Sequence, residues 1–270
     1  MYPLSRVLII AGSDSSGGAG IQADIKTVTL LGSYAMTAVT AVTAQNTMGV
    51  KKITPIPKKN VLKQITMILD DIGVDAVKIG MLYSVSTIKC VYHILKKYNL
   101  KNIVIDPVMV AKGGARLMNS NSITCLKKLL LPLAKLITPN IPEAEILSGY
   151  SISNKKDMIQ AAKTILNMGP KNVLLKGGHL RNKMIFDILV TKKKITVFPK
   201  RKIRTKNTHG TGCTLSSALA TCLSQKKSIF ESCKISLKYV NRAIIYAPGY
   251  GKGFGPLNHL VSLNLRNTNV

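Results

Sequence analysis

The sequence is poor in cysteine, aromatic residues and acidic residues. Its five cysteines include no CxxC pair and are odd in number, which argues against a disulfide framework or a zinc site and favours a reducing, cytoplasmic location. No apolar run reaches 18 residues, so no segment is predicted to span a membrane. The short apolar run before residue 11 lacks the cleavage site of a signal peptide and is interpreted as a buried first strand.

The scarcity of acidic residues leaves a large positive charge: 11 aspartates and glutamates stand against 39 lysines and arginines, a net charge of +28. Such an excess can indicate binding to nucleic acid or to an anionic membrane. Here the basic pairs and triplets are spread over the whole chain, and aromatic residues, 5% of the total, do not alternate with them. We therefore expect neither a nucleic-acid partner nor a membrane partner, and interpret the lysines as ordinary solvated positions.

What the sequence does contain is a regular alternation of short β-branched segments with longer segments of helical periodicity. This alternation predicts a mostly parallel sheet with helices on both faces, a three-layer α/β/α fold, with an antiparallel hairpin at one edge. With 270 residues, 46% of them hydrophobic, the chain is expected to form a single domain over 1–270. Strands are predicted at 5–12, 34–45, 76–80, 102–106, 135–138, 172–176, 184–191 and 194–198, and helices at 21–32, 59–72, 85–98, 120–131, 155–168, 213–224 and 229–246.

The loop after the first predicted strand is rich in glycine and serine. It reads AGSDSSGGAG over residues 11–20 and leads into a helix. Ligands bind at the carboxyl ends of strands in such sheets, glycine allows them to approach the backbone closely, and a helix start offers free amides. A plain strand-to-helix turn needs fewer glycines, so the loop indicates a site for a small polar ligand.

A second glycine motif, NTHGTGC, precedes the helix predicted at 213–224. The amides of Gly210, Thr211 and Gly212 are predicted to converge at the positive end of that helix and to form an anion hole for a phosphoryl group. Cys213 would lie in the first turn, where the helix dipole is expected to lower the thiol pKa toward neutrality and make it a general base. The alternative, a buried structural cysteine, is our interpretation of the other four cysteines.

Oxygen-bearing side chains follow two further strand ends. Asp106 ends one strand, and Asn140 and Glu143 follow the next. Carboxylate and amide oxygens suit Mg²⁺, which binds few protein groups besides water and nucleotide phosphates. Asn140 and Glu143 equally fit the start of a helix, as a capping box. Lys176, after another strand, is placed to meet a phosphate.

These loops together resemble those of the ribokinase superfamily, in which a GTG motif at a helix start receives the γ-phosphate and the next residue, usually aspartate, is the base. Cysteine at that position resembles the hydroxymethylpyrimidine kinases of thiamine biosynthesis and a minority of pyridoxal kinases. Further segments narrow the resemblance to the first group. They are AGSDSSGGAGIQADIKT (11–27), TAVTAQNT (40–47), KIGML (78–82), DPVM (106–109), LITPNIPEAE (136–145), LKGGH (175–179) and NTHGTGCT (207–214).

The resemblance implies a ribokinase-like kinase that uses ATP as co-substrate, with Mg²⁺, to phosphorylate 4-amino-5-hydroxymethyl-2-methylpyrimidine and then its monophosphate. It also implies a homodimer. For individual positions, it implies that Cys213 is the base beside the anion hole of Gly210, Thr211 and Gly212. Gln45 would bind the aminopyrimidine edge, because a carboxamide offers both a donor and an acceptor. The same resemblance assigns Asp24, Gly12, Met81 and Val108 to the substrate pocket, Lys176, Asp106 and Thr208 to ATP, and Asp106, Asn140 and Glu143 to the metal.

Two other functions are compatible with parts of the sequence. Pyridoxal kinase is the alternative within the same superfamily, since pyridoxal is also a ring with a hydroxymethyl arm. A non-catalytic protein that uses its charge to bind RNA or a membrane surface would leave the anion-hole cysteine and the glycine-rich loop without a role. His209 stays unassigned, because a lone histidine in a loop is more often structural.

Overall fold

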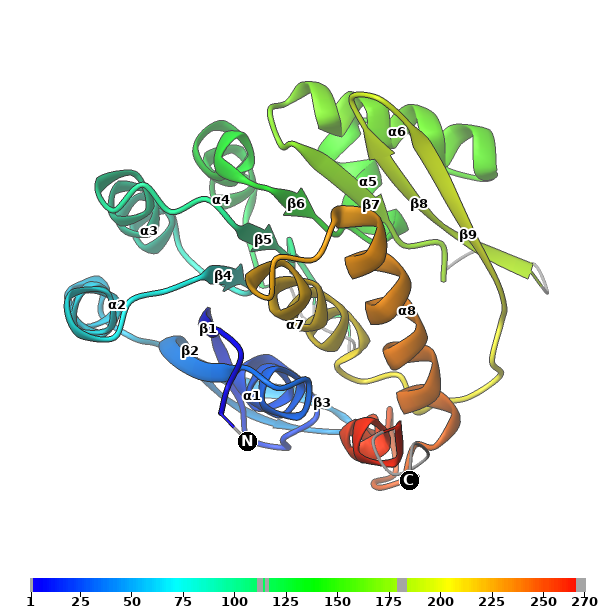
Figure 1. Ribbon diagram of the computed structural model, residues 1–270, viewed down its shortest axis with the longest axis horizontal. Coiled ribbons are helices and arrows are strands. Elements are labelled where there is room, and N and C mark those ends of the chain that lie inside the picture. The colour runs from blue at the N-terminus through cyan, green and yellow to red at the C-terminus, as the bar shows by residue number, and fades with distance from the viewer. Residues whose placement is uncertain (1, 111–113, 115–116, 179–183, 266–270) are drawn as a thin grey trace.

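The computed structural model describes residues 2–110, 114, 117–178 and 184–265; His179, at the end of the LKGGH segment, lies outside them. The described strands form one sheet in the order β3-β2-β1-β4-β5-β6-β7-β8-β9 (Figure 1). Their bounds are β1 Arg6–Asp14, β2 Tyr34–Asn46, β3 Gly49–Pro55, β4 Ala76–Ile79, β5 Ile103–Ile105, β6 Leu136–Ile137, β7 Asn172–Leu175, β8 Met184–Thr191 and β9 Ile195–Arg201.

The sheet is parallel in the middle and antiparallel at both edges. β2, β1, β4, β5, β6 and β7 pair in parallel, which confirms the predicted mostly parallel sheet. The predicted hairpin is also confirmed, as β7, β8 and β9 pair antiparallel. At the opposite edge, β3 adds an antiparallel strand that the sequence analysis did not predict. Its lysines and proline are poor strand signals, but they are typical of an edge strand that must not pair with another chain.

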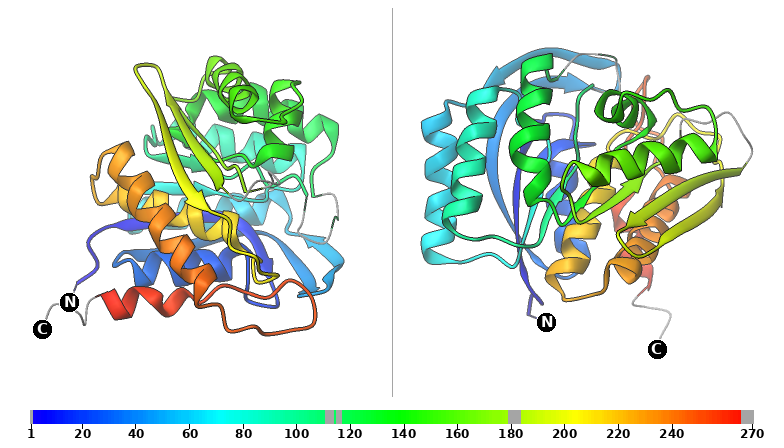
Figure 2. Two further views of the ribbon diagram at one scale, coloured as in Figure 1. Left: turned by 90° about the vertical axis from the view of Figure 1, so that its right-hand side faces the viewer. Right: turned by 90° about the horizontal axis from the view of Figure 1, so that it is seen from above.

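Helices cover both faces of this sheet (Figures 1 and 2). Apolar side chains of α1, α7 and α8 pack on one face, and those of α2 to α6 pack on the other. The three-layer α/β/α arrangement is therefore confirmed. The helix bounds are α1 Gly20–Leu30, α2 Lys58–Asp71, α3 Val85–Lys97, α4 Ser120–Cys125, α5 Ile141–Ser148, α6 Lys155–Asn167, α7 Thr211–Ser224 and α8 Ile229–Ile245.

Two helical segments differ from the prediction. The helix expected at 120–131 is α4 followed by a π-helical turn at Leu126–Leu130 and a 3-10 turn at Leu131–Leu133, so Pro132 falls where the α-helix has already ended. The short α5 was not predicted as an element, although its capping box was recognised as one interpretation of Asn140 and Glu143. Across the described part of the chain, no helix combines the length and apolar character that a membrane crossing requires.

Candidate active site

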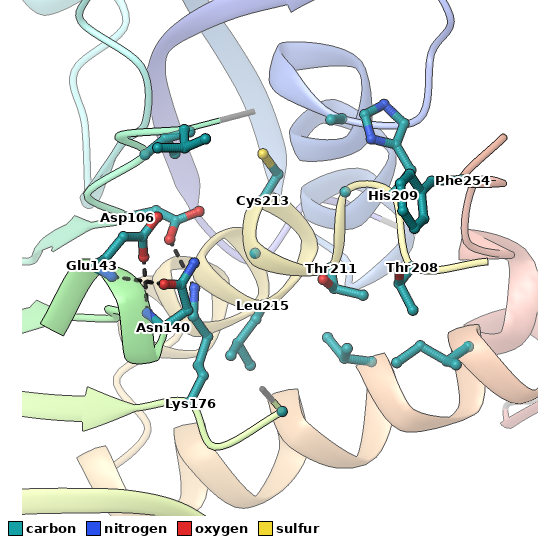
Figure 3. A pocket seen from close by; sticks show the side chains of 18 of the residues that line it. Asp106, Asn140, Glu143, Lys176, Thr208, His209, Thr211, Cys213, Leu215 and Phe254 are labelled. Atoms are coloured by element: carbon teal, nitrogen blue, oxygen red, sulfur yellow. Dashed lines mark hydrogen bonds and ion pairs between the residues drawn. The ribbon is translucent and has the colours of Figure 1, made fainter. Parts of the chain in front are cut away.

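One cavity of about 710 Å³ lies at the carboxyl ends of the parallel strands, where the start of α7 faces the loops that follow β1, β5, β6 and β7 (Figure 3). Most of the predicted site residues line it, although they come from seven separate segments of the chain. These residues are Gly12, Gln45, Met81, Asp106, Val108, Asn140, Glu143, Lys176, Thr208, Gly210, Thr211, Gly212 and Cys213.

The start of α7 lines the cavity and is a helix N-terminus without a side-chain cap. Gly210 is the N-cap residue with a φ of 82°, and none of the described side chains caps the helix. A Cβ atom at Gly210 would overlap the carbonyl oxygen of Gly18, so only glycine allows this approach. The first amides of a helix have no partners within it. The amide of Thr211, however, donates to the carbonyl oxygen of Thr208 at 3.4 Å, and the anion hole predicted at Gly210, Thr211 and Gly212 stays a prediction.

The two glycine-rich loops are joined by a buried pair, Asp14 and His209. His209 Nε2 lies 2.7 Å from Asp14 Oδ2, and the same carboxylate accepts hydrogen bonds from Ser16 and from the amide of Ala19. Burial alone would raise the pKa of Asp14, but the hydrogen bonds from His209 and Ser16 lower it to about 2. The sequence analysis left His209 open and passed over Asp14; an acidic residue at a strand end within a loop of serines and glycines was the available signal.

The Asp14 contacts predict a loss of stability in acid. A pKa lowered from 3.8 to about 2 means that the ionised carboxylate stabilises the fold above pH 4, and that this contribution disappears as the pH falls through 2. The contribution amounts to about 2 kcal/mol. Denaturant unfolding at pH 6, 4, 3 and 2 should show it as a steeper fall in the free energy of unfolding than the Asp14→Asn variant shows. Parallel curves for the two proteins would contradict the assignment.

Cys213 lies in the first turn of α7, as predicted, but its ionisation differs from the prediction. Burial raises the pKa of the Cys213 thiol to about 12, although the ammonium of Lys78 and the amide of Gly20 act in the opposite direction. The expectation of a pKa near neutrality is therefore wrong. The helix-dipole argument considered only the helix, whereas the thiol is also desolvated and faces the carboxylates of Asp24 and Asp106.

Asp106, Lys176, Asn140 and Glu143 gather on one side of Cys213 (Figure 3). Lys176 Nζ lies 3.1 Å from Asp106 Oδ1, while Asp106 Oδ2 faces Gly212. Asn140 and Glu143 form a capping box at the start of α5, each accepting a hydrogen bond from the backbone amide of the other. Burial raises the pKa of Glu143 to about 7. This side of the cavity thus combines the Lys176 ammonium with two carboxylates, of which that of Asp106 lies beside Gly212.

Another part of the cavity lining is apolar, with one polar side chain beside it. Met81 packs in an apolar cluster with Ala41, Leu117 and Val108, and Gly12 lies so close that a Cβ there would overlap the Met81 methyl group. Gln45 provides the polar edge. Its Oε1 is 3.1 Å from Thr43 Oγ1, and its Nε2 is 3.4 Å from His209 Nε2.

Asp24 is the one predicted substrate residue that does not line the cavity. It is fully buried, and its two carboxylate oxygens bind Lys78 Nζ and Ser217 Oγ. The motif resemblance placed Asp24 near the substrate pocket but did not indicate that its side chain is fully buried. Lys78, which the sequence analysis did not single out, does line the cavity.

The sequence analysis also missed an apolar wall formed by α7 and α8. Leu215, Leu237, Val240 and Ile244 line the cavity, and Phe254 lines it as well. The sequence shows the residues of α7 and α8 among these as the apolar faces of their helices. Periodicity does not distinguish a side chain that faces a cavity from one that faces the core.

Comparison with known proteins adds an independent line of evidence. The family model described as phosphomethylpyrimidine kinase matches residues 14–258. A hydroxymethylpyrimidine/phosphomethylpyrimidine kinase of Bacillus subtilis is 43% identical over 255 residues, 94% of this chain and 94% of that protein. A thiamine biosynthesis bifunctional protein of Geobacter sulfurreducens is 49% identical over 97% of this chain, which spans only 53% of that protein.

Solved structures of similar proteins have the same fold. A phosphomethylpyrimidine kinase of Clostridium difficile is 46% identical, with a TM-score of 0.80 over 89% of this chain and 99% of that one. A pyridoxal kinase of Bacillus subtilis, solved with ADP, is 37% identical, with a TM-score of 0.89 over 97% and 99% of the two chains. A pyridoxal kinase of Staphylococcus aureus, solved with AMP-PCP and pyridoxal, is 33% identical, with a TM-score of 0.88 over 95% and 93%.

The matches confirm the ribokinase-like fold and the kinase resemblance that the loops suggested. The family model, the Bacillus subtilis relative and the Clostridium difficile structure are all named as pyrimidine kinases, whereas the pyridoxal kinases are structural neighbours of lower identity. This chain belongs to the phosphomethylpyrimidine kinase family.

Proposed function

We propose that the chain transfers the γ-phosphate of ATP to the hydroxymethyl group of 4-amino-5-hydroxymethyl-2-methylpyrimidine, and then phosphorylates the resulting monophosphate to the diphosphate. The observation that carries this proposal is that one cavity contains the start of α7 with Cys213, the charged residues Asp106 and Lys176 (Figure 3), and Gln45 with the apolar Met81. This arrangement brings a hydroxyl and a phosphoryl donor to the same point.

In the proposed reaction, Gln45 holds the aminopyrimidine edge and directs the hydroxymethyl arm toward Cys213. The thiolate of Cys213 takes the hydroxyl proton, the hydroxyl oxygen bonds to the γ-phosphorus, and the bond between that phosphorus and ADP breaks. The negative charge on the transferred group is stabilised by the amides at Gly210, Thr211 and Gly212. Lys176 and Thr208 face the ATP phosphates, and the apolar wall of α7 and α8 holds the adenine.

The residues beside the anion hole fit a magnesium ion bound mainly through water. Within the described residues, no group of three or more histidines, cysteines and acidic side chains forms a closed metal cage. Mg²⁺ does not need one, because it usually takes one or two carboxylates and keeps several waters. Asp106 is the candidate for direct contact, through Oδ2. Asn140 and Glu143 each use a side-chain oxygen in the capping box of α5, so they would bind the ion through water. A bound Mg²⁺ would neutralise phosphate charge.

The proposed activity can be tested with the purified chain, Mg-ATP and each pyrimidine substrate, with monophosphate and diphosphate products resolved by chromatography. We expect both products to form, and pyridoxal to be phosphorylated more slowly under the same conditions. Phosphorylation of pyridoxal alone would overturn the substrate assignment while leaving the kinase family intact.

The pyrimidine pocket predicts a selective effect of the Gln45→Ala substitution. Loss of the carboxamide leaves polar groups of the bound ring unpaired, which costs about 1–3 kcal/mol, or about 5-fold to 150-fold in kcat/KM for the pyrimidine. The KM for ATP should stay within about twofold, because Gln45 is on the other side of the anion hole. Gln64→Ala is a matched control, since Gln64 bonds the backbone of Val39 and does not line the cavity. Unchanged pyrimidine kinetics would remove Gln45 from the site.

We also propose that the chain is a single kinase domain, a homodimer and cytoplasmic. Exposed apolar side chains at the β2 and β3 edge, Val42 and Met48, support an interface with a second copy, which sedimentation velocity would test. All five cysteines are free thiols, which supports a reducing compartment.

A further inference from the structure

A charged side chain lies in the centre of the sheet beneath Cys213. Lys78 is on β4, and its side chain is 0% exposed. Its ammonium lies 2.6 Å from Asp24 Oδ2, and Asp24 Oδ1 accepts a hydrogen bond from Ser217 Oγ at 2.7 Å. A buried ion pair contributes little net stability compared with well-packed apolar residues, because both charges lose their hydration. Stability alone therefore does not explain the presence of this buried ion pair.

The position of the pair supplies another reason. Ser217 is one helical turn after Cys213 on α7, and residues four apart share a helix face. Asp24 is one turn after Gly20 on α1, and the Gly20 amide acts on the Cys213 thiol. The ion pair is therefore held by the same two helix faces that enclose the thiol. Gly80 leaves space for the ammonium, because a Cβ there would come within 2.9 Å of Lys78 Nζ.

The charges around the thiol come from four elements. Lys78 on β4 and Asp24 on α1 form the pair itself, Asp106 follows β5, and Lys176 follows β7. Lys176 already contacts Asp106. Burial alone would lower the pKa of Lys78, but attraction by Asp24 and Cys213 outweighs it and raises that pKa, so the ammonium remains charged. Lys78 is thus a permanent buried cation near the thiol.

We infer that Lys78 is a positioning residue for Cys213: its ammonium, anchored by Asp24, stabilises the thiolate form of Cys213 inside the cavity. The inference rests on the proposed function in taking the thiolate as the base. Asp24 has a double effect, because it holds the cation in place and also opposes the thiolate with its own negative charge. Removing the two charges one at a time should therefore change thiolate formation in opposite directions.

The test is the rate at which iodoacetamide alkylates Cys213 at pH 8, followed by mass spectrometry of the Cys213 peptide. Alkylation requires the thiolate, so its rate follows the ionised fraction. Lys78→Met should lower the rate at least about tenfold, the effect of one pH unit in thiol ionisation. Asp24→Asn should raise it severalfold. No phosphoryl transfer is involved, so these rates can agree with the inference even where the proposed pyrimidine kinase activity fails.

The same measurement contains its own controls. Cys90, partly exposed on α3, should react at the same rate in every variant, whereas the buried Cys222 and Cys233 should stay unreactive unless the fold opens. If a single substitution unfolds the chain, the double variant Lys78→Met with Asp24→Asn removes both charges and leaves no unpaired one. Its Cys213 rate should lie below that of the unmodified chain, because the cation acts on the thiol more strongly than Asp24 does.

A shift in the same direction for both single variants would overturn the inference, and so would a double variant that reacts as fast as the unmodified chain. A supporting readout comes from turnover. Lys78→Met should lower kcat about tenfold with the KM values for ATP and pyrimidine within twofold, as expected for a charge that acts through the base.

Discussion

Replacing Cys213 with alanine is expected to lower kcat by about 10²-fold to 10⁴-fold, the contribution typical of a positioned general base. Cys213→Ser should be nearly as poor as alanine, because a serine hydroxyl does not ionise at these pH values. Cys213→Asp should keep part of the activity, since aspartate is the usual residue at this position in the superfamily that the chain resembles. Single-turnover rates with saturating Mg-ATP would measure all three. A serine variant with wild-type turnover would show that the anion hole acts without this base.

The raised pKa of the Cys213 thiol also predicts how the reaction rate depends on pH. With a pKa of about 12, Cys213 is almost fully protonated at neutral pH, and each added pH unit increases the thiolate tenfold. The logarithm of kcat/KM, which reports the ionisation of the free enzyme, should therefore rise with a slope near one between pH 6 and 9, without a plateau. The Cys213→Asp variant should show a flat profile over the same range. A plateau of kcat/KM near pH 7 in the unmodified enzyme would contradict the raised pKa of the thiol.

Gly210→Ala is expected to have the next largest effect. The substitution introduces a side chain at a φ of 82° and drives its Cβ into the carbonyl oxygen of Gly18. The first amides of α7 must then move, and losing even one such donor typically costs about 10²-fold to 10³-fold in kcat. We expect kcat to fall by about this amount, measured per folded molecule after circular dichroism has established the folded fraction.

Gly149→Ala is the matched control for that experiment. Gly149 ends α5 with a φ of 80°, but no described atom lies within 4 Å of the position that its Cβ would take. It therefore carries the backbone strain, about 1–2 kcal/mol, without the collision, and its kcat should stay unchanged. If Gly210→Ala keeps kcat within threefold of Gly149→Ala, the close approach to Gly18 is not needed for the anion hole.

The central part of the fold could be predicted because its strands are buried on both faces and are therefore continuously apolar. β3 could not, since an exposed edge strand such as Gly49–Pro55 is selected for charge and not for apolar alternation. α5 was missed because eight residues are too few for a clear helical period.

The candidate site could likewise be predicted only in part. Glycine motifs and strand ends predict which backbone segments meet, because those features are local in sequence. Cys213 was placed correctly but its pKa was not, since burial and neighbouring carboxylates are properties of the assembled fold. A lysine within an apolar strand, as at Lys78, was an available signal for a buried ion pair, but its partner Asp24 could be identified only in three dimensions.

The contact between Asp14 and His209 joins residues 195 positions apart, and the cavity lining includes Phe254 near the end of the described chain. A nascent chain can pair β1, β2 and β4 early, but it cannot assemble the predicted anion hole until α7 has been made and has packed against those strands. Contacts of such long range form slowly, because the intervening chain must be closed into a loop first. Chains that end before α7 lack the amides of Gly210, Thr211 and Gly212, so we expect them to lack the phosphate site proposed there.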